Sequence, residues 1–493
     1  MAKAAAKQKT AKVQGAAAFT GPELCRLTAT EVVALLRKGE IAASEALDAA
    51  LTRIGQVEGA INAMPTVCAE RARASLKEIG KRKRAHGQHV AWLAGLPIGI
   101  KDLTPVKGVR STFGTKAFAD NIATESDPLV ERLENRGGIV VGMTNTPEMG
   151  AGGNTFNAVF GMTRNPRDTR KNAGGSSGGA AASLAAGEVW LSHGSDFAGS
   201  LRTPAALCGV VGLRPSPGRA GGAPPVVAFN TEGVQGPMAR NVMDTALFLD
   251  AMAGWDPRVP ISIDAPPEPF QAAVRKAKPN VRIAYAPTLD GFAEVEPEID
   301  AVLRHALRLA EKEGATVEET CPELPDLYPT FVTLRGLAWG SLPGMKAPEV
   351  QKHYKKTLRE NIALGYKLKP EQIFKAFHGK AALYFKMQEF LTQWDVLACP
   401  VVGLEAQDVE IEYPTSVNGR PMKDYIDWLR FAFLATTTGL PALSLPVGFT
   451  RSGMPVGLQL IGPPRGEARL LAVARAVELA VKFPSTPIDP RTP

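Results

Sequence analysis

The sequence reads Lys171-Asn-Ala-Gly-Gly-Ser-Ser-Gly-Gly-Ala-Ala-Ala-Ser183 at its most glycine-rich point, with adjacent serines at Ser176 and Ser177. A second turn of this kind follows at His193-Gly-Ser-Asp-Phe-Ala-Gly-Ser-Leu-Arg202, where Ser200 comes directly after a glycine. Glycines this dense are needed where the backbone adopts conformations that other residues avoid, or approaches another group closely. Backbone amides beside a serine hydroxyl are components of an anion or oxyanion site.

Helical and strand patterns alternate on both sides of these turns. Asp127-Pro128 predicts the start of a helix, and the apolar run 139–142 follows it as a core strand. The same order recurs where a strand at 281–285 precedes a helix containing Leu303 and Leu307. This alternation predicts an α/β fold in which helices cover a largely parallel or mixed sheet. The segments 442–449 and 455–461 are predicted to form a hairpin.

The domain organisation follows from composition along the 493 residues. Residues 1–19 are rich in alanine, lysine and glutamine and lack the apolar segment of a signal peptide, which predicts a disordered basic tail. No repeat or low-complexity linker divides residues 20–493, which we therefore expect to form one domain. Within it, about 322–393 is mainly helical and is predicted to be a variable region near the substrate pocket, as a lid or a pocket wall.

The composition is that of an ordinary soluble enzyme, with 45% apolar and 22% charged residues. The apolar runs are interrupted well before the roughly 20 residues that a membrane span needs. Five scattered cysteines argue against a disulfide framework or zinc site and predict a reducing, cytoplasmic compartment. Although the net charge is +8, four lysines of the tail precede the first acid. The basic run 81–84 is therefore predicted to be an exposed helix end or loop and no nucleic-acid patch.

Two familiar chemistries fit the serines poorly. Residues 174–178 match the GxSxG elbow of α/β-hydrolases, which requires a strand directly before it. The preceding 163–172 is polar and broken by proline, so we expect a loop there, and His193 is expected to be a packed core residue. A phosphate-binding loop is also disfavoured, because the sequence contains neither GxxxxGK[ST] nor a GxGxxG in the required context.

A serine nucleophile activated by a lysine is the third chemistry. The lysine must be neutral to accept a proton, and burial lowers a lysine pKa because the ammonium loses its hydration. Lys101 stands near the end of the apolar run 96–103 and is the candidate. By itself, however, its position favours a surface lysine whose charged end reaches water, because most lysines are surface residues. A second serine can pass the proton between nucleophile and base.

At this point the sequence resembles the amidase signature enzymes, serine hydrolases that include fatty acid amide hydrolase and the A subunit of glutamyl-tRNA amidotransferase. The matching segments, in the family's order and covering most of residues 25–480, are 95–102, 142–149, 174–179, 194–204, 208–213, 439–446 and 453–462. The resemblance implies a single large domain with a long twisted mixed β-sheet covered by helices on both sides.

The resemblance also implies a Ser-Ser-Lys triad at matching positions. Ser200 would be the nucleophile, Ser176 the proton relay and Lys101 the base, with a cis peptide bond before Ser176. The oxyanion hole would consist of the backbone N–H groups of Phe197, Ala198, Gly199 and Ser200.

Further positions match less decisively. Asp196 and Arg202 are read as scaffold for the second turn, and Ser177 as support for the first. Met149 and Gly150 align with a loop that lines the family's acyl pocket. Ala198 replaces a glycine that is common in the family. Its N–H still serves the oxyanion hole if its φ stays negative, and its added methyl group would narrow the pocket.

The activity implied is hydrolysis of the C–N bond of a linear carboxylic amide through an acyl-enzyme, with side activity on esters or carbamates and no metal or organic cofactor. The partner expected is a small-molecule amide, with no nucleic acid or membrane, and a homodimer is the family-like state. The alternative is an A-type subunit of a tRNA-dependent amidotransferase that releases ammonia from glutamine. A non-catalytic binding protein on the same scaffold is disfavoured, because all three triad residues are present.

Overall fold

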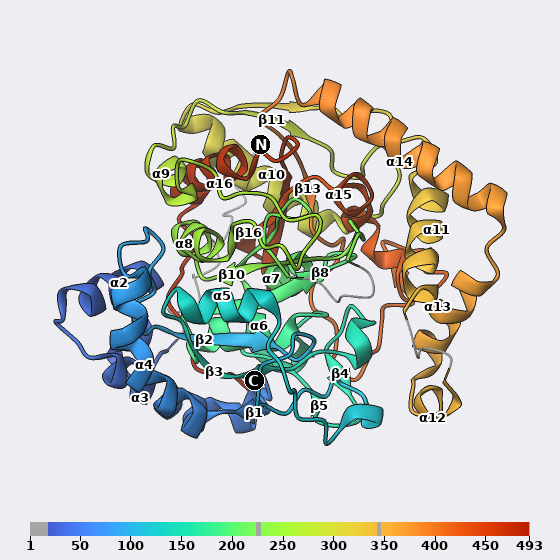
Figure 1. Cartoon of the computed structure of the whole chain (residues 1–493). Coiled ribbons are helices and arrows are strands. Elements are labelled where there is room, and N and C mark those ends of the chain that lie inside the picture. The colour runs from blue at the N-terminus through green and yellow to red at the C-terminus, as the bar shows by residue number, and fades with distance from the viewer. Residues whose placement is uncertain (1–17, 223–227, 343–346, 493) are drawn as a thin grey trace, which may run out of the picture.

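An eleven-stranded mixed sheet runs through the molecule (Figure 1). The computed structural model describes residues 18–222, 228–342 and 347–492. In spatial order the strands are β1 (Thr66–Val67), β3 (Ile139–Thr144), β2 (Pro97–Lys101), β8 (Leu191–Asp196), β10 (Val234–Ala239), β9 (Val211–Arg214), β16 (Ala442–Phe449), β17 (Pro455–Ile461), β13 (Val396–Pro400), β11 (Arg282–Tyr285) and β12 (Thr316–Glu319). β2 is parallel to both β3 and β8, and β11 is parallel to both β12 and β13, whereas the other neighbours are antiparallel.

Helices surround this sheet in Figure 1. They are α1 (Glu23–Arg26), α2 (Ala29–Lys38), α3 (Ala43–Ile61), α4 (Ala69–His86), α5 (Pro128–Asn135), α6 (Gly178–Ala186), α7 (Arg202–Cys208), α8 (Val242–Met252), α9 (Phe270–Arg275), α10 (Pro297–Lys312), α11 (Leu327–Gly340), α12 (Pro348–Gln351), α13 (Lys356–Tyr366), α14 (Pro370–Phe390), α15 (Phe433–Thr438) and α16 (Glu467–Val481). Short 3-10 helices lie at η1 (Lys116–Phe118), η2 (Glu148–Gly150) and η4 (Asp427–Ala432).

Alternating residues of β3 contribute to two different cores. Val140 packs in a cluster with side chains of α5 and α8, whereas Val141 packs in another with side chains of α3 and α6. Successive side chains of a strand point to opposite faces of its sheet, so the sheet is covered on both sides. The predicted single domain with a mixed sheet between helices is therefore the observed architecture.

Several local predictions are confirmed at the residue level. Asp127 caps α5 by accepting the N–H of Leu129, and Pro128 is the first residue of that helix. β16 and β17 form the predicted antiparallel hairpin. The basic run 81–84 lies in the last turns of α4 and is largely exposed, as expected for a solvated helix end. The region 322–393 contains α11, α12, α13 and α14, which stand along one side of the molecule (Figure 1).

Two small pairs of strands lie outside the central sheet and matter near the site. β4 (Phe156–Asn157) pairs with β5 (Gly161–Met162), and β6 (Arg164–Asn165) pairs with β7 (Asp168–Asn172). The loop expected at 163–172 is thus wrong, because these residues form a tight hairpin. Buried polar side chains make it possible: Asn165 donates to the carbonyl oxygens of Asn172 and Leu207. A third short pair joins β14 (Ser416–Val417) to β15 (Arg420–Pro421).

The predicted tail boundary requires a small shift. Residues 1–17 lie outside the described residues, but Phe19 is buried and its ring lies 4.6 Å from the guanidinium carbon of Arg53. The amide of Asp489 donates to the carbonyl of Ala18, which ties the two ends of the described chain together. The packed body therefore begins by residue 18.

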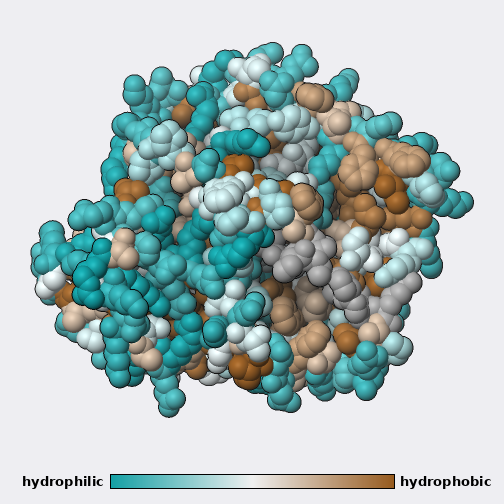
Figure 2. All heavy atoms as spheres, in the orientation of Figure 1, coloured by the Kyte–Doolittle hydropathy of each residue, from teal (hydrophilic) through white to brown (hydrophobic). Residues whose placement is uncertain are grey.

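The surface and composition of the described chain add three observations. All five cysteines are free thiols. In the part of the chain that the structure describes, we find neither a helix long and apolar enough to cross a membrane nor a group of side chains that could hold a metal ion. Figure 2 shows apolar surface in the region of α11 and α14. Three phenylalanines of α14 are exposed: Phe374, Phe377 and Phe385.

Candidate active site

Two serine-containing turns meet at one edge of the sheet. Lys101 ends β2 and Asp196 ends β8, and because these strands are parallel their carboxyl ends lie at the same edge. Ser176 and Ser177 directly precede α6, and Ser200 lies just before α7. The N–H of Ser177 donates to the carbonyl of Ser200 at 3.1 Å and holds the two turns side by side. The peptide bond between Gly175 and Ser176 is cis, as predicted.

Lys101 is completely buried at the centre of this arrangement. Its Nζ donates to the hydroxyl oxygens of Ser176 at 2.7 Å, Ser177 at 2.9 Å and Ser195 at 3.1 Å. Burial lowers the pKa of Lys101 to about 7, although the charge of Asp196 acts in the opposite direction. The surface-lysine interpretation is therefore wrong, and near neutral pH this amine can both accept and return a proton.

Asp196 organises the second turn. Its carboxylate accepts from the backbone N–H groups of Gly199 and Leu201, and the guanidinium of Arg202 binds both carboxylate oxygens at 2.8 and 3.0 Å. Burial alone would raise the pKa of Asp196, but the guanidiniums of Arg202 and Arg214 hold it well below its usual range. This carboxylate is therefore fully paired by groups of the described chain.

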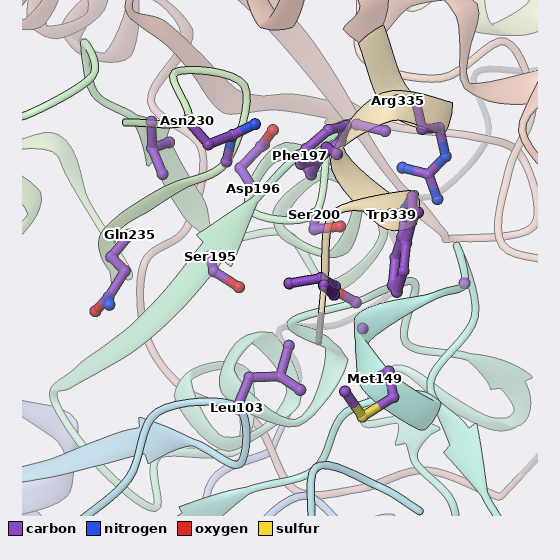
Figure 3. A pocket seen from close by; sticks show the side chains of 18 of the residues that line it. Leu103, Met149, Ser195, Asp196, Phe197, Ser200, Asn230, Gln235, Arg335 and Trp339 are labelled. Carbon is purple, nitrogen blue, oxygen red and sulfur yellow. The ribbon is translucent and has the colours of Figure 1, made fainter. Parts of the chain in front are cut away.

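A cavity of about 230 Å³ opens beside the two turns (Figure 3). Ser176 and Ser200 both border it, as do Met149 and Gly150 from the loop after β3. α11 supplies Arg335, Ala338 and Trp339 to the opposite lining, so part of the region 322–393 is a wall of this cavity, as predicted. No hydrogen bond joins Ser176 to Ser200 among the described residues. In ligand-free sites such catalytic hydrogen bonds are often long and close only around a substrate.

Comparison with known proteins defines the family. The family model described as Amidase matches residues 45–471, which include both turns and Lys101. The chain belongs to the amidase family. Its solved structural neighbours are amidase signature enzymes, among them a bacterial aryl acylamidase with a TM-score of 0.85 and 27% identity, aligned over 92% of this chain and 96% of that one.

Two curated relatives of this amidase have different roles. An acylamidase of Rhodococcus erythropolis is 34% identical over 93% of this chain and 96% of its own length. The A subunit of glutamyl-tRNA(Gln) amidotransferase from Moorella thermoacetica is also 34% identical, over 94% of this chain and 98% of its own length. Similarity alone therefore leaves both roles open.

The backbone amides of the second turn correct one prediction. The N–H of Gly199 donates to the Asp196 carboxylate at 3.0 Å, so it is not free to bind an oxyanion. The N–H groups of Phe197, Ala198 and Ser200 have no acceptor among the residues that the structure describes. Gly199 has a φ of +94°, whereas the φ of Ala198 is not positive. Gly199 is thus needed for the backbone conformation of the turn, and its N–H does not contribute to the oxyanion hole.

His193 is structural in this amidase. It is fully buried, its Nε2 lies 2.8 Å from Gln235 Oε1, and its Nδ1 accepts the backbone N–H of Lys101 at 3.4 Å. Burial lowers its pKa to about 3. Although β7 and α6 supply the strand and helix that an elbow needs, no hydrogen bond links His193 to either Ser176 or Ser200 in the described chain. The GxSxG match is therefore accidental.

Three residues of the site were not singled out from the sequence. Ser195 contacts Lys101, Arg214 binds Asp196, and Arg335 borders the cavity. Ser195 lies within the matched segment 194–204, and Arg214 directly follows the matched segment 208–213, which was the available signal. Arg335 lies in a helical region without a motif, and nothing in its local sequence distinguishes it.

Proposed function

We propose that this amidase hydrolyses the C–N bond of a linear carboxylic amide with Ser200 as nucleophile, Ser176 as proton relay and Lys101 as base. The observation that carries the proposal is the buried Lys101 amine, whose Nζ lies 2.7 Å from Ser176 Oγ at the wall of the cavity. A lysine that burial holds near neutrality is the base that a Ser–Lys mechanism requires.

The proposed reaction has two halves. Ser200 Oγ attacks the carbonyl carbon while its proton passes through the Ser176 hydroxyl to the neutral Lys101. The tetrahedral intermediate collapses as the C–N bond breaks and the same proton returns through Ser176 to the leaving nitrogen. Water then attacks the acyl ester by the reverse proton path, which releases the acid and restores Ser200. Esters and carbamates have the same electrophilic carbonyl and are expected side substrates.

Stabilisation of the oxyanion is assigned to the N–H groups of Phe197, Ala198 and Ser200. Each donor of this kind contributes roughly 3 kcal/mol to the transition state. The φ of Ala198 is not positive. We therefore include the N–H of Ala198 among the donors of the oxyanion hole. Its methyl group also borders the cavity.

The cavity lining favours a free-standing amidase over a glutamine-dependent subunit. Free glutamine carries an α-ammonium group. When glutamine binds in a cavity this group loses its hydration, so it would need a carboxylate partner there. Asp196 is the only acid among the described residues that line the cavity, and its two oxygens are already bound by Arg202, Arg214 and two backbone amides. The stretches 223–227 and 343–346 contain no Asp or Glu. An amide without an ammonium group fits this lining better.

The proposal is tested with the chain expressed alone. We expect turnover of aryl and alkyl amides by the isolated protein, no turnover by Ser200→Ala, and labelling of Ser200 by a fluorophosphonate probe. Ser452→Ala, which removes an exposed hydroxyl bound to Glu405, is the matched control and should keep full activity. Amide hydrolysis at an unchanged rate in Ser200→Ala would refute the assignment. Ammonia release from glutamine only with co-expressed partner subunits would support the amidotransferase role instead.

A further inference from the structure

Arg335 is a buried cation that borders the cavity without a counter-charge. Its side chain belongs to a residue that is only 4% exposed, and it lines the same cavity as Ser200. A guanidinium has five N–H donors and no acceptor. In the described chain only one nitrogen, NH2, has a partner, the hydroxyl of Tyr425, while Nε is buried without any acceptor. Most of its hydrogen-bonding capacity is unused.

No acid of this chain is placed to neutralise it. Arg335 forms no ion pair with any described residue, and residues 1–17, 223–227 and 343–346 contain no Asp or Glu. Asp196 is occupied by Arg202 and Arg214. Other charges near the Tyr425 ring are also paired: Lys355 Nζ lies 6.0 Å above that ring and binds Glu412 at 2.9 Å.

Two other buried arginines bind acceptors of the protein through at least two of their nitrogens, although Nε of Arg240 is also buried without an acceptor among the described residues. Arg202 gives its N–H groups to Asp196, Gln459 and Thr436. Arg240 gives its terminal N–H groups to the carbonyls of Cys25 and Leu27. Arg335 differs from both because it combines burial, unused donors and a position on the cavity wall.

Aromatic rings hold the Arg335 guanidinium in place. Its central carbon lies 5.4 Å from the ring centre of Phe197, 5.6 Å from Trp339 and 5.7 Å from Tyr425. Figure 3 shows it beside Phe197 and above Trp339. Such rings attract and orient a cation but leave its charge and remaining N–H groups available. Because Phe197 is three residues before Ser200, this oriented cation belongs to the wall beside the reacting turn.

We propose that the substrate of this amidase carries a carboxylate that binds Arg335. The planar guanidinium can offer two parallel N–H groups to a carboxylate, which is the strongest pairing available to either group outside water. The inference rests on the proposed function, which supplies the amide bond that is cleaved. It adds that the substrate belongs to the class of amides that carry a carboxylate. Both short monoamides of dicarboxylic acids and N-acyl derivatives of amino-carboxylic acids have this chemistry.

The first experiment compares matched substrates. Glutaric acid monoanilide carries the carboxylate on the acyl side, and N-butyryl-4-aminobenzoate carries it on the amine side. Each is paired with the neutral analogue in which a methyl ketone replaces the carboxylate. We expect kcat/KM to be at least about tenfold higher for one of the two carboxylates than for its ketone, mainly through KM, since hydrogen bonds to charged groups are the stronger ones. The favoured pair identifies the side of the amide that faces Arg335.

Variants assign that preference to one residue. Arg335→Gln is expected to remove the preference while changing turnover of the neutral ketones less than about twofold. Arg304→Gln removes an arginine that also lies over a tyrosine ring but is bound to Asp300 and Glu319, and it should leave the preference intact. No preference in the wild type, or an equal loss for charged and neutral substrates in Arg335→Gln, overturns the inference.

A binding measurement separates this inference from the catalytic proposal. Glutarate or 4-acetamidobenzoate should raise the thermal midpoint of Ser200→Ala, and the shift should disappear when Arg335→Gln is added. A shift of the thermal midpoint without amide turnover by the wild type would contradict the proposed function but support the anion site. Amide turnover without a shift of the midpoint would contradict the anion site alone. If Arg335→Gln does not fold, Arg335→Lys keeps the charge but lacks the planar pair of N–H groups, and it must reduce the carboxylate preference.

Discussion

Lys101 Nζ and Ser176 Oγ lie 2.7 Å apart although 75 residues separate them in the sequence. The side chain of Lys101 is completely buried in this contact. The charged form of its amine therefore loses its hydration, and its hydrogen-bond partners are hydroxyl groups. This relationship sets the pH range in which the site can accept a proton, and it connects the first predictions below.

The pH dependence of activity should follow Lys101. Burial lowers its pKa to about 7, and only the unprotonated amine can accept a proton. We therefore expect kcat/KM for a neutral amide to rise as the pH increases through about 7 and to level off above it. Lys101→Ala should lose several orders of magnitude in rate together with this inflection. A flat profile between about pH 6 and 8 in the wild type would contradict Lys101 as the base.

Ser177 and Ser195 should act by positioning Lys101. Their hydroxyl oxygens accept from its Nζ, which favours the charged form, so removing either acceptor lowers the lysine pKa. Ser177→Ala is expected to move the inflection of the pH profile to lower pH. It is also expected to reduce kcat roughly tenfold, because the Ser177 hydroxyl also binds the backbone of Ser195. Ser195→Ala should shift the inflection in the same direction. A lower rate with an unmoved inflection would mean that these serines do not act through Lys101.

Removing the charge of Asp196 should destabilise the fold strongly. Asp196→Asn leaves the buried guanidiniums of Arg202 and Arg214 without their anion, and breaking a buried pair in this way costs about 3–5 kcal/mol. Urea unfolding followed by circular dichroism measures the loss. Asp408→Asn is the control: its carboxylate is 65% exposed and pairs with Lys171, so the change should cost at most about 1 kcal/mol. Equal stabilities of the two variants would contradict the central role of Asp196.

Gly179 should be intolerant of a side chain. A Cβ there would lie 2.3 Å from the backbone N of Asn145 and 2.4 Å from the carbonyl oxygen of Ala63, and neither group can swing away as a side chain would. Gly179→Ala is expected to cost about 3 kcal/mol or more, measured by thermal and urea unfolding. Gly59→Ala, inside α3 with open space around it, should instead stabilise by about 0.5–1 kcal/mol. A well-folded Gly179→Ala of normal stability would show that α6 can move away from β3.

Much of the fold was predictable because its signals are local. The start of α5 follows from Asp127-Pro128, and β16 and β17 have the bounds predicted for the hairpin segments 442–449 and 455–461. The hairpin at 163–172 was missed because its order comes from buried amide side chains such as Asn165, which read as loop residues in sequence. Gly199 was assigned to the wrong group because only the structure places the Asp196 carboxylate on its N–H.

The chain's own pattern determined which segments become helices, strands and tight glycine turns, since these depend on neighbours a few residues away, and its motif order was specific enough to identify the family. Only the tertiary structure decided that Lys101 is buried against Ser176, that Asp196 is saturated, and that Arg335 faces the cavity unpaired. The physical reason is that desolvation and charge pairing depend on groups that the fold brings together from distant positions, such as Arg202 and Gln459, which are 257 residues apart.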